Sequence, residues 1–183
     1  MAVYISFLRG VNMTGHNKIR MVELAALYRD LGFADAETYI QSGNVIFKGA
    51  EDLQSSDISA RIETAIKDRF GFKIPAMIRS AGDLEDLALV NPFLYEDNFN
   101  PAKMAVIFLQ EEVSAEQCDR MATIDYPPDK FRIEKREIFV YCPNGFGKTK
   151  LYTNFFENKM GVTGTARNWK TITTISAITG KRL

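Results

Sequence analysis

The chain has 183 residues, of which 46% are hydrophobic and 25% charged, an ordinary composition for a globular protein that excludes intrinsic disorder. Basic and acidic residues are equal in number, at 23 each, so the chain lacks the net positive charge on which general nucleic-acid binding depends. The longest apolar stretch near the N-terminus, residues 2–8, is interrupted by Arg9 and is too short for a signal peptide or a membrane-spanning helix. The sequence therefore predicts a cytoplasmic protein with no membrane partner.

Cysteine and histidine are too sparse to build a metal site. Cys118 and Cys142 do not form a Cys-x-x-Cys pair, and His16 is the single histidine. Zinc coordination requires several such side chains at defined spacings. We therefore predict no metal and no cofactor, and we expect both cysteines to be packing residues.

The first half of the chain alternates short β-type segments with helical periodicities. Residues 9–17 form a loop rich in glycine and asparagine, and Gly32 is a typical helix end. Ser42-Gly43 predicts a tight hairpin, and Ser56-Asp57 is expected to cap the second helix. The predicted order is a strand at 3–8, a helix from 18 to 31, strands at 38–40 and 44–48, a helix from 56 to 70, a strand at 74–78 and a helix at 82–90.

The second half repeats this order of elements. Ser114 and Gln117 have the spacing of a capping box, and Lys135-Arg136 is a charged turn between two β-type segments. Repetition of the order indicates a duplication, with repeats at 1–92 and 103–183 and a linker at 93–102. The predicted elements are a strand at 103–109, a helix at 114–121, a hairpin of 131–134 and 137–141, a helix at 151–160, a strand at 162–166 and a helix at 168–179.

The element order predicts an α+β fold of duplicated ferredoxin-like split βαβ units. Each unit consists of βαββαβ plus a following helix, which gives an antiparallel sheet of four strands with helices on one face. Residues 104–109 are apolar at every position, whereas a strand with one solvent-facing side alternates. We therefore expect the second face of this strand to be covered, either by the other repeat or by another subunit.

This topology brings two polar segments of the first repeat together. The third strand of a split βαβ unit lies between the first two and antiparallel to them, so the end of strand one lies beside the hairpin turn. Residues 9–12, Arg-Gly-Val-Asn, are thereby placed beside residues 41–44, Gln-Ser-Gly-Asn. A guanidinium, amides and a hydroxyl near glycines could bind an anion or a planar polar ligand. The alternative is that glycine and asparagine serve only the turns, and that Arg9 forms an ion pair.

Three other patterns carry weaker signals. Residues 142–149 end in Gly-Lys-Thr, but their spacing differs from that of a phosphate-binding loop, so nucleotide hydrolysis is not predicted. The start of the following helix could still attract an anion weakly. Asn168 is expected to cap the last helix and Trp169 to pack, with Arg79-Ser80 at the matching junction of the first repeat. Residues 43–48 lack the basic-glycine-aromatic pattern of RNA-recognition modules, which makes RNA binding a minor alternative.

Seven segments, in order along the chain, carry a recognisable signature. They are Phe-Leu-Arg-Gly-Val-Asn at 7–12, Gly-Phe at 32–33, Thr-Tyr-Ile-Gln-Ser-Gly-Asn-Val at 38–45, Asn-Pro-Phe at 91–93, Pro-Asn-Gly at 143–145 with Lys-Leu at 150–151, and Thr-Ala-Arg-Asn-Trp at 165–169. Together they resemble domain of unknown function family 1697. The resemblance implies a mostly bacterial protein with a duplicated ferredoxin-like fold, and it implies no particular activity. Its signature positions include the polar loops described above, at Arg9, Gly10, Asn12, Ser42, Gly43, Asn44, Arg167 and Asn168.

The leading functional hypothesis is a site for a small anionic ligand, bearing a phosphate or a carboxylate, where residues 9–12 meet residues 41–44. Arg9 supplies the charge, and Arg167 and Asn168 join the site if the repeats bring their loops together. No residue is an evident nucleophile or general base, so catalysis is left open. The alternative is a structural or protein-interaction module that forms a homodimer through a sheet face.

Overall fold

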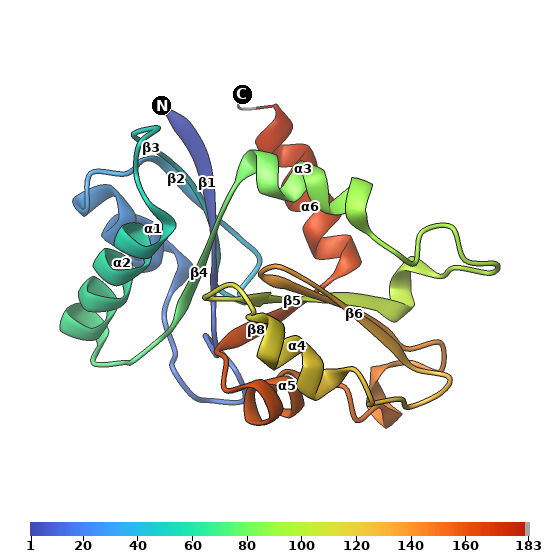
Figure 1. The fold of residues 1–183 in the computed structure, drawn as a ribbon. Helices are drawn as coiled ribbons and strands as arrows, with labels where there is room; N and C mark the ends of the chain where they lie inside the picture. The colour runs from blue at the N-terminus through green and yellow to red at the C-terminus, as the bar shows by residue number, and fades with distance from the viewer. Residues whose placement is uncertain (182–183) are drawn as a thin grey trace. The chain divides into compact units, whose positions relative to one another are not determined.

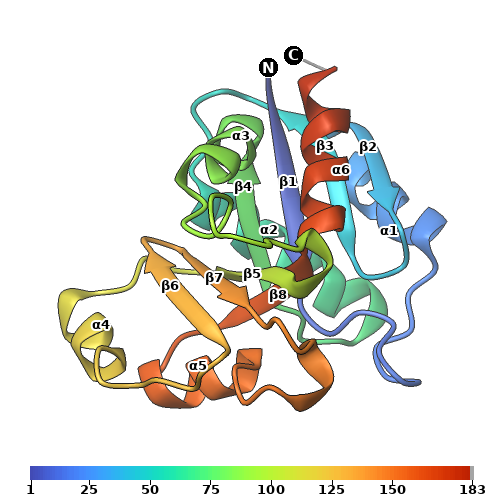
Figure 2. The same ribbon diagram turned by 90° about the vertical axis from the view of Figure 1, so that its right-hand side faces the viewer.

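The computed structural model describes residues 1–181, which divide by their internal contacts into two compact units. The first unit is Met1–Asp86 together with the C-terminal segment that begins at Ile175, and the second is Leu87–Thr174. Each unit contains one sheet of four strands (Figure 1, Figure 2). The repeat boundaries at residues 92 and 103 stay a prediction.

The first sheet has the strand order β2-β3-β1-β4, and all of its neighbouring strands are antiparallel. The first and second strands thus lie on either side of the third, as the split βαβ arrangement requires. Helices α1 and α2 lie on one face of this sheet (Figure 1). The elements are β1 (Ala2–Leu8), α1 (Met21–Asp30), β2 (Ala34–Tyr39), β3 (Asn44–Gly49), α2 (Ser55–Phe70), β4 (Ala76–Ser80) and α3 (Ala81–Val90).

The second sheet repeats that order as β6-β7-β5-β8, again with antiparallel neighbours. Its elements are β5 (Met104–Leu109), α4 (Ala115–Met121), β6 (Lys130–Glu134), β7 (Glu137–Tyr141), α5 (Thr153–Met160), β8 (Gly164–Asn168) and α6 (Trp169–Gly180), with 3-10 turns η1 (Pro101–Lys103) and η2 (Phe146–Lys148). The predicted α+β fold with a duplicated βαβ arrangement is confirmed.

An aromatic cluster forms the centre of the first core. The Phe47 ring of β3 lies 4.7 Å from the Phe33 ring, 5.2 Å from Tyr28 and 5.9 Å from Tyr4, measured between centroids. Aromatic pairs at these separations stabilise a core beyond the area they bury. Isoleucines of α2 and leucines of α1 complete the cluster between the helices and the sheet.

One buried hydrogen bond makes the first core sensitive to alkaline pH. The Tyr28 hydroxyl lies 2.5 Å from the Ser6 hydroxyl, and Tyr28 is completely buried. Burial raises the pKa of Tyr28 well above its usual value. The unfolded tyrosine ionises at about pH 10, whereas the folded one keeps its proton, so the stability that Tyr28 contributes is lost as pH rises above that value.

We expect Tyr28→Phe to lower the free energy of unfolding by about 1–2 kcal/mol at pH 7, because the buried Ser6 hydroxyl loses its partner. Between pH 7 and pH 10.5, the variant should then lose less stability than the wild type. Urea unfolding at both pH values measures this difference. Tyr95→Phe, at a side chain that is 90% exposed, is the control, and an alkaline loss in Tyr28→Phe equal to that of the wild type would contradict the prediction.

The second core confirms the expectation for the apolar strand, since all six residues of β5 are buried. One face of the sheet packs on α4 and α5 through residues that include Ile107, Val140 and Phe156. The opposite face receives part of its cover from the segment predicted as a linker. The rings of Phe93 and Phe99 stack on Tyr141 of β7, at centroid distances of 5.8 and 5.5 Å.

Several helix signals in the sequence are confirmed by the observed caps. Ser114 accepts a hydrogen bond from the Gln117 backbone, and the Gln117 side chain accepts one from the Ser114 backbone, which is the predicted capping box. Asn168 accepts from the backbone N–H of Thr171 and so caps α6, as expected. Trp169 is buried, also as expected.

Other predicted element ends are wrong, for local reasons. The α2 cap is Gln54 rather than Ser56-Asp57, which lie inside the first turn of a helix that begins at Ser55. Ile40 has a φ of 51° and belongs to the turn that follows β2, so that strand ends at Tyr39. The strand predicted at 74–78 begins after Pro75, and the one predicted at 162–166 begins at Gly164. The helix predicted from residue 151 begins at Thr153.

Candidate functional site

The end of β1 lies against the β2–β3 turn, as the topology predicts. Phe7 pairs with Asn44, and the Leu8 backbone N–H donates to the Gly43 carbonyl over 2.8 Å. Gly43 has a φ of +74°, and a Cβ built on it would lie 2.9 Å from the Leu8 Cβ and 3.1 Å from the Val11 Cβ. Only glycine fits both this backbone conformation and this close approach. We call this meeting of residues 9–12 and 41–44 the polar corner.

Asn12 joins the two sides of the polar corner through its side-chain amide. Its Nδ2 donates to the carbonyls of Ile19 and Gln41, each at 3.0 Å, and its Oδ1 accepts from the Ile19 backbone over 2.9 Å. Both amide hydrogens are therefore used within the protein. The same bonds hold the chain around Ile19 in place, and Arg20 is extended, so α1 begins at Met21 rather than at the predicted residue 18.

Asn44 has a similar structural role on the hairpin side. Its side chain is fully buried, and its Nδ2 donates to the Tyr39 carbonyl over 3.0 Å and to the Ser42 hydroxyl over 2.9 Å. These bonds close the turn between β2 and β3. The amides that the sequence suggested for ligand recognition thus serve as the internal frame of the polar corner.

Arg9 and Gly10 form the remaining part of the predicted set in this unit. Gly10 has a φ of +72°, and its carbonyl accepts from the Asn17 side chain over 3.1 Å. Arg9 is half-buried, and its backbone N–H donates to the Pro75 carbonyl over 3.0 Å. It is the one charged residue among the predicted positions of the first unit.

An open groove of about 710 Å³ adjoins the polar corner and shares two residues, Asn12 and Gln41, with it. Lys18 and Arg20 supply positive charge along the groove, and Arg20 forms a 2.7 Å ion pair with Glu23. The hydrogen bond of this pair raises the pKa of Arg20 and lowers that of Glu23. The full lining is Asn12, Gly15, Lys18, Ile19, Arg20, Met21, Val22, Glu23 and Gln41.

Sequence reasoning missed Lys18 and Arg20, because it placed the first as the start of a helix and gave the second no role. The available signal was a pair of basic residues directly after a loop rich in glycine and asparagine. Such a loop ends close to the polar corner only because Asn12 ties it there.

Arg167 and Asn168 lie on β8 of the second unit. Arg167 is 8% exposed, and its Nη1 donates to the Thr165 hydroxyl and to the Ala166 carbonyl, both at 2.8 Å. Burial lowers the pKa of Arg167 to about 10. The membership of these two residues in a site with Arg9 stays a prediction.

The matching strand-to-helix junction of the first unit is built in the same way. Arg79 of β4 is 1% exposed, and its Nη1 donates to the carbonyl of the preceding residue, Ile78, as Arg167 does to Ala166. Ser80 and Asp83 then exchange hydrogen bonds at the start of α3. A buried guanidinium needs such partners, because desolvation is costly. The duplication therefore extends to individual hydrogen bonds, since both junctions contain the same arginine-to-carbonyl bond.

Neither a metal cluster nor a membrane segment is found within residues 1–181. No group of three or more His, Cys, Asp or Glu side chains there is arranged to hold a metal ion. No helix in that range is long and apolar enough to cross a membrane.

Comparison with known proteins places the chain in a family. A solved structure of SP0830, a conserved bacterial protein from Streptococcus pneumoniae, superposes with a TM-score of 0.77 at 23% sequence identity, over 97% of this chain and 98% of that one, and shows the same fold. No curated protein sequence is significantly similar to this chain. The signature of DUF1697, described as "Protein of unknown function", matches residues 1–139, and the chain therefore belongs to that family, as the sequence motifs indicated.

Proposed function

We propose that the protein binds a small anionic ligand in the groove beside the polar corner. The observation that carries this proposal is the position of the Asn12 amide, which ties the Ile19 side of the groove to the Gln41 side next to two basic residues. A site whose walls are held by internal hydrogen bonds loses little entropy on binding. The frame of the site then consists of Asn12, Ser42, Gly43 and Asn44. The basic side chains of the groove make contact with the ligand.

The charges of the groove favour an anion. Lys18 is exposed and has no ion-pair partner within residues 1–181. Arg20 forms an ion pair with the carboxylate of Glu23. The Arg20 side chain is 81% exposed, so water weakens this pair. Two cations and one carboxylate leave a net positive lining that suits a phosphate or a carboxylate.

The rival proposal is a docking surface for a protein partner, favoured by apolar exposure at the same place. Val22 lines the groove and is 78% exposed. Met13 and Ile40, the chain neighbours of Asn12 and Gln41, are 59% and 50% exposed. Apolar side chains gathered around a groove are typical of interaction surfaces. A protein partner would cover these three side chains, whereas a small anion leaves them in water.

We expect pyrophosphate or succinate to raise the melting temperature of the wild type and not that of the Lys18→Ala, Arg20→Ala double variant. A ligand at about 100 times its dissociation constant adds about 2.7 kcal/mol to stability, which a thermal-shift assay detects. Lys67→Ala removes an exposed lysine of α2 and is the matched control. Both substitutions concern exposed side chains, so the fold should persist.

Two results would overturn this proposal. The first is the absence of any shift with either anion, and the second is an equal shift in the double variant. Concentration-dependent self-association that Val22→Ser abolishes would favour the rival.

A further inference from the structure

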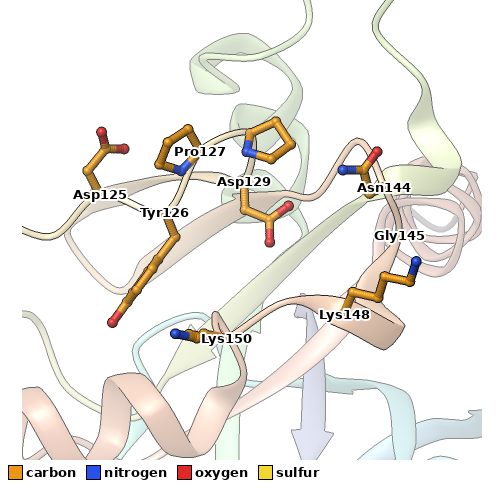
Figure 3. Close-up of a pocket in the computed structure, with 9 residues that line it drawn as sticks. Asp125, Tyr126, Pro127, Asp129, Asn144, Gly145, Lys148 and Lys150 are labelled. Carbon is orange, nitrogen blue, oxygen red and sulfur yellow. The ribbon is translucent and has the colours of Figure 1, made fainter.

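A second pocket, of about 360 Å³, lies in the second unit between residues 125–129 and residues 144–150 (Figure 3). It contains none of the residues assigned to the polar corner. Its lining combines two lysines, two carboxylates, an amide, an aromatic ring and two prolines. These residues are Asp125, Tyr126, Pro127, Pro128, Asp129, Asn144, Gly145, Lys148 and Lys150.

The wall formed by residues 144–150 is held by its own hydrogen bonds. The Gly145 backbone donates to the Cys142 carbonyl over 2.7 Å, and the Tyr152 hydroxyl donates to the Phe146 carbonyl over 2.8 Å. The hydroxyl of the buried Thr149 accepts from the Leu151 backbone over 3.0 Å. Gly145 has φ 86° and ψ 161°, a conformation reserved for glycine. The sequence suggested only weak anion attraction for this segment.

The opposite wall is a short turn that presents an aromatic ring. The Asp129 backbone donates to the Tyr126 carbonyl over 2.9 Å, which closes the turn. The Tyr126 ring packs edge-on against Phe155, and the Lys150 ammonium lies 5.3 Å from the ring centroid. Figure 3 shows the ring and this ammonium side by side. The ring therefore offers an apolar surface next to a positive charge.

Three ammonium groups lie in or next to the pocket, two of them on the Gly145 side and that of Lys150 beside the Tyr126 ring (Figure 3). Lys148 and Lys150 line the pocket, and the Nζ of Lys103 lies 3.2 Å from the point that a Cβ on Gly145 would occupy. None of these three lysines forms an ion pair within residues 1–181. Asp125 and Asp129 likewise make no ion pair in the part of the chain that the structure describes. The pocket thus holds positive and negative groups that do not neutralise one another.

We infer that this pocket binds a phosphate monoester of a hydroxylated ring, such as a sugar phosphate or a nucleotide. The phosphate lies on the Gly145 side of the pocket, where the ammonium groups of Lys103 and Lys148 donate charge-assisted hydrogen bonds, and Lys150 adds positive charge beside the Tyr126 ring. The ring hydroxyls donate to Asp129, whose carboxylate points toward the middle of the lining residues (Figure 3), and the Tyr126 ring covers an apolar face of the ligand. A free phosphate would neutralise only the lysines, and a metal ion would neutralise only the carboxylates. Only a ligand with both an anion and hydroxyl donors satisfies both sets.

The thiol next to the pocket is suited to packing rather than to chemistry. Cys142 is fully buried, and burial raises the pKa of its thiol, although a hydrogen bond with Thr149 acts in the opposite direction. A protonated, buried thiol is a poor nucleophile. The inference is therefore one of binding.

Isothermal titration of the full chain with ribose 5-phosphate, AMP, ribose and inorganic phosphate tests the inference. We expect ribose 5-phosphate or AMP to bind. The compound with the higher affinity shows whether the pocket prefers a sugar phosphate or a nucleotide. The Lys148→Ala, Lys150→Ala double variant should bind it at least about tenfold more weakly. Asp129→Asn should weaken the binding of the phosphate ester and leave the binding of inorganic phosphate unchanged. Lys159→Ala, an exposed lysine of α5, is the matched control and should bind as the wild type does.

Three results would overturn the inference. They are no binding of either ester, affinity unchanged in the lysine double variant, and inorganic phosphate binding as tightly as both esters. The Lys18→Ala, Arg20→Ala variant separates this pocket from the groove of the first unit. It should bind ribose 5-phosphate or AMP normally, so each proposal can fail without the other.

Discussion

Asn44→Asp is expected to lower the free energy of unfolding by about 3 kcal/mol or more at pH 7. The two side chains have the same shape, but a carboxylate has no hydrogen to donate. The Tyr39 carbonyl and the Ser42 hydroxyl would each lose the donor that Asn44 provides. The new charge would also be fully buried, since Asn44 is 0% exposed. Urea unfolding followed by circular dichroism measures the loss.

The pH dependence of this variant has a definite sign. Burial raises the pKa of the new carboxyl in the folded state, whereas the unfolded chain ionises it at about pH 4. The unfolded state therefore loses its proton first, and the variant becomes progressively less stable as pH rises from 4 to 7. Its difference from the wild type should be smaller at pH 4 than at pH 7.

Asn168→Asp provides the matched control for the same chemical change. The Asn168 side chain accepts a hydrogen bond from Thr171 and is exposed at the start of α6, where a carboxylate is at least as good a cap. We expect a change of less than about 0.5 kcal/mol at pH 7. Equal effects of the two substitutions would contradict the structural role assigned to Asn44.

Gly43→Ala is expected to cost about 2–4 kcal/mol, from two sources that add. A methyl group at a φ of +74° adopts a backbone conformation that L-residues avoid, and it would also lie 2.9 Å from the Leu8 Cβ. Leu8 and Val11 belong to the packed core, so they cannot move aside without strain. Denaturant titration of the purified variant measures the loss.

Gly71→Ala isolates the conformational part of this cost. Gly71 ends α2 at a φ of +77°, and no atom lies within 4 Å of the position of its missing Cβ. We expect a loss of about 1 kcal/mol, which is the strain of the left-handed backbone alone. If Gly43→Ala costs no more than Gly71→Ala, the close approach of β1 to the hairpin turn does not constrain this site.

These expectations divide the polar corner and the adjoining groove into two kinds of residue. Asn12, Gly43 and Asn44 hold the backbone, so changing them should lower stability whether or not a ligand is present. Lys18 and Arg20 are exposed and hold nothing in the core, so changing them should affect binding and leave stability nearly unchanged. Ligand recognition is therefore best tested on the exposed cations of the groove.

Much of the fold was predictable because its signals are short-range. The capping box of Ser114 and Gln117 and the helix cap of Asn168 involve residues three apart. The continuous apolar run at 104–109 indicated a strand covered on both faces, and all six residues are buried. Even the meeting of Leu8 with Gly43 followed from element order, since the split βαβ arrangement leaves one place for the third strand.

The errors lie where a distant or unexpected partner changes the local structure. Ile40 has strong β-propensity, yet it takes a left-handed conformation in the turn that Asn44 closes. The start of α1 is delayed to Met21, because Asn12 holds the backbone of Ile19. Neither effect is visible in the periodicity of the sequence, which reports burial and not hydrogen-bond partners.

The amino-acid sequence by itself determined the order of helices and strands, the duplication and the family, because each depends on neighbouring residues or on motifs. Only the tertiary structure decided what the polar side chains do. The Asn12 amide bonds to Gln41, 29 positions away along the chain, and this bond makes it part of the frame. An asparagine in a loop has the same residue type whether it binds a ligand or a carbonyl of its own chain, so only the folded backbone distinguishes the two.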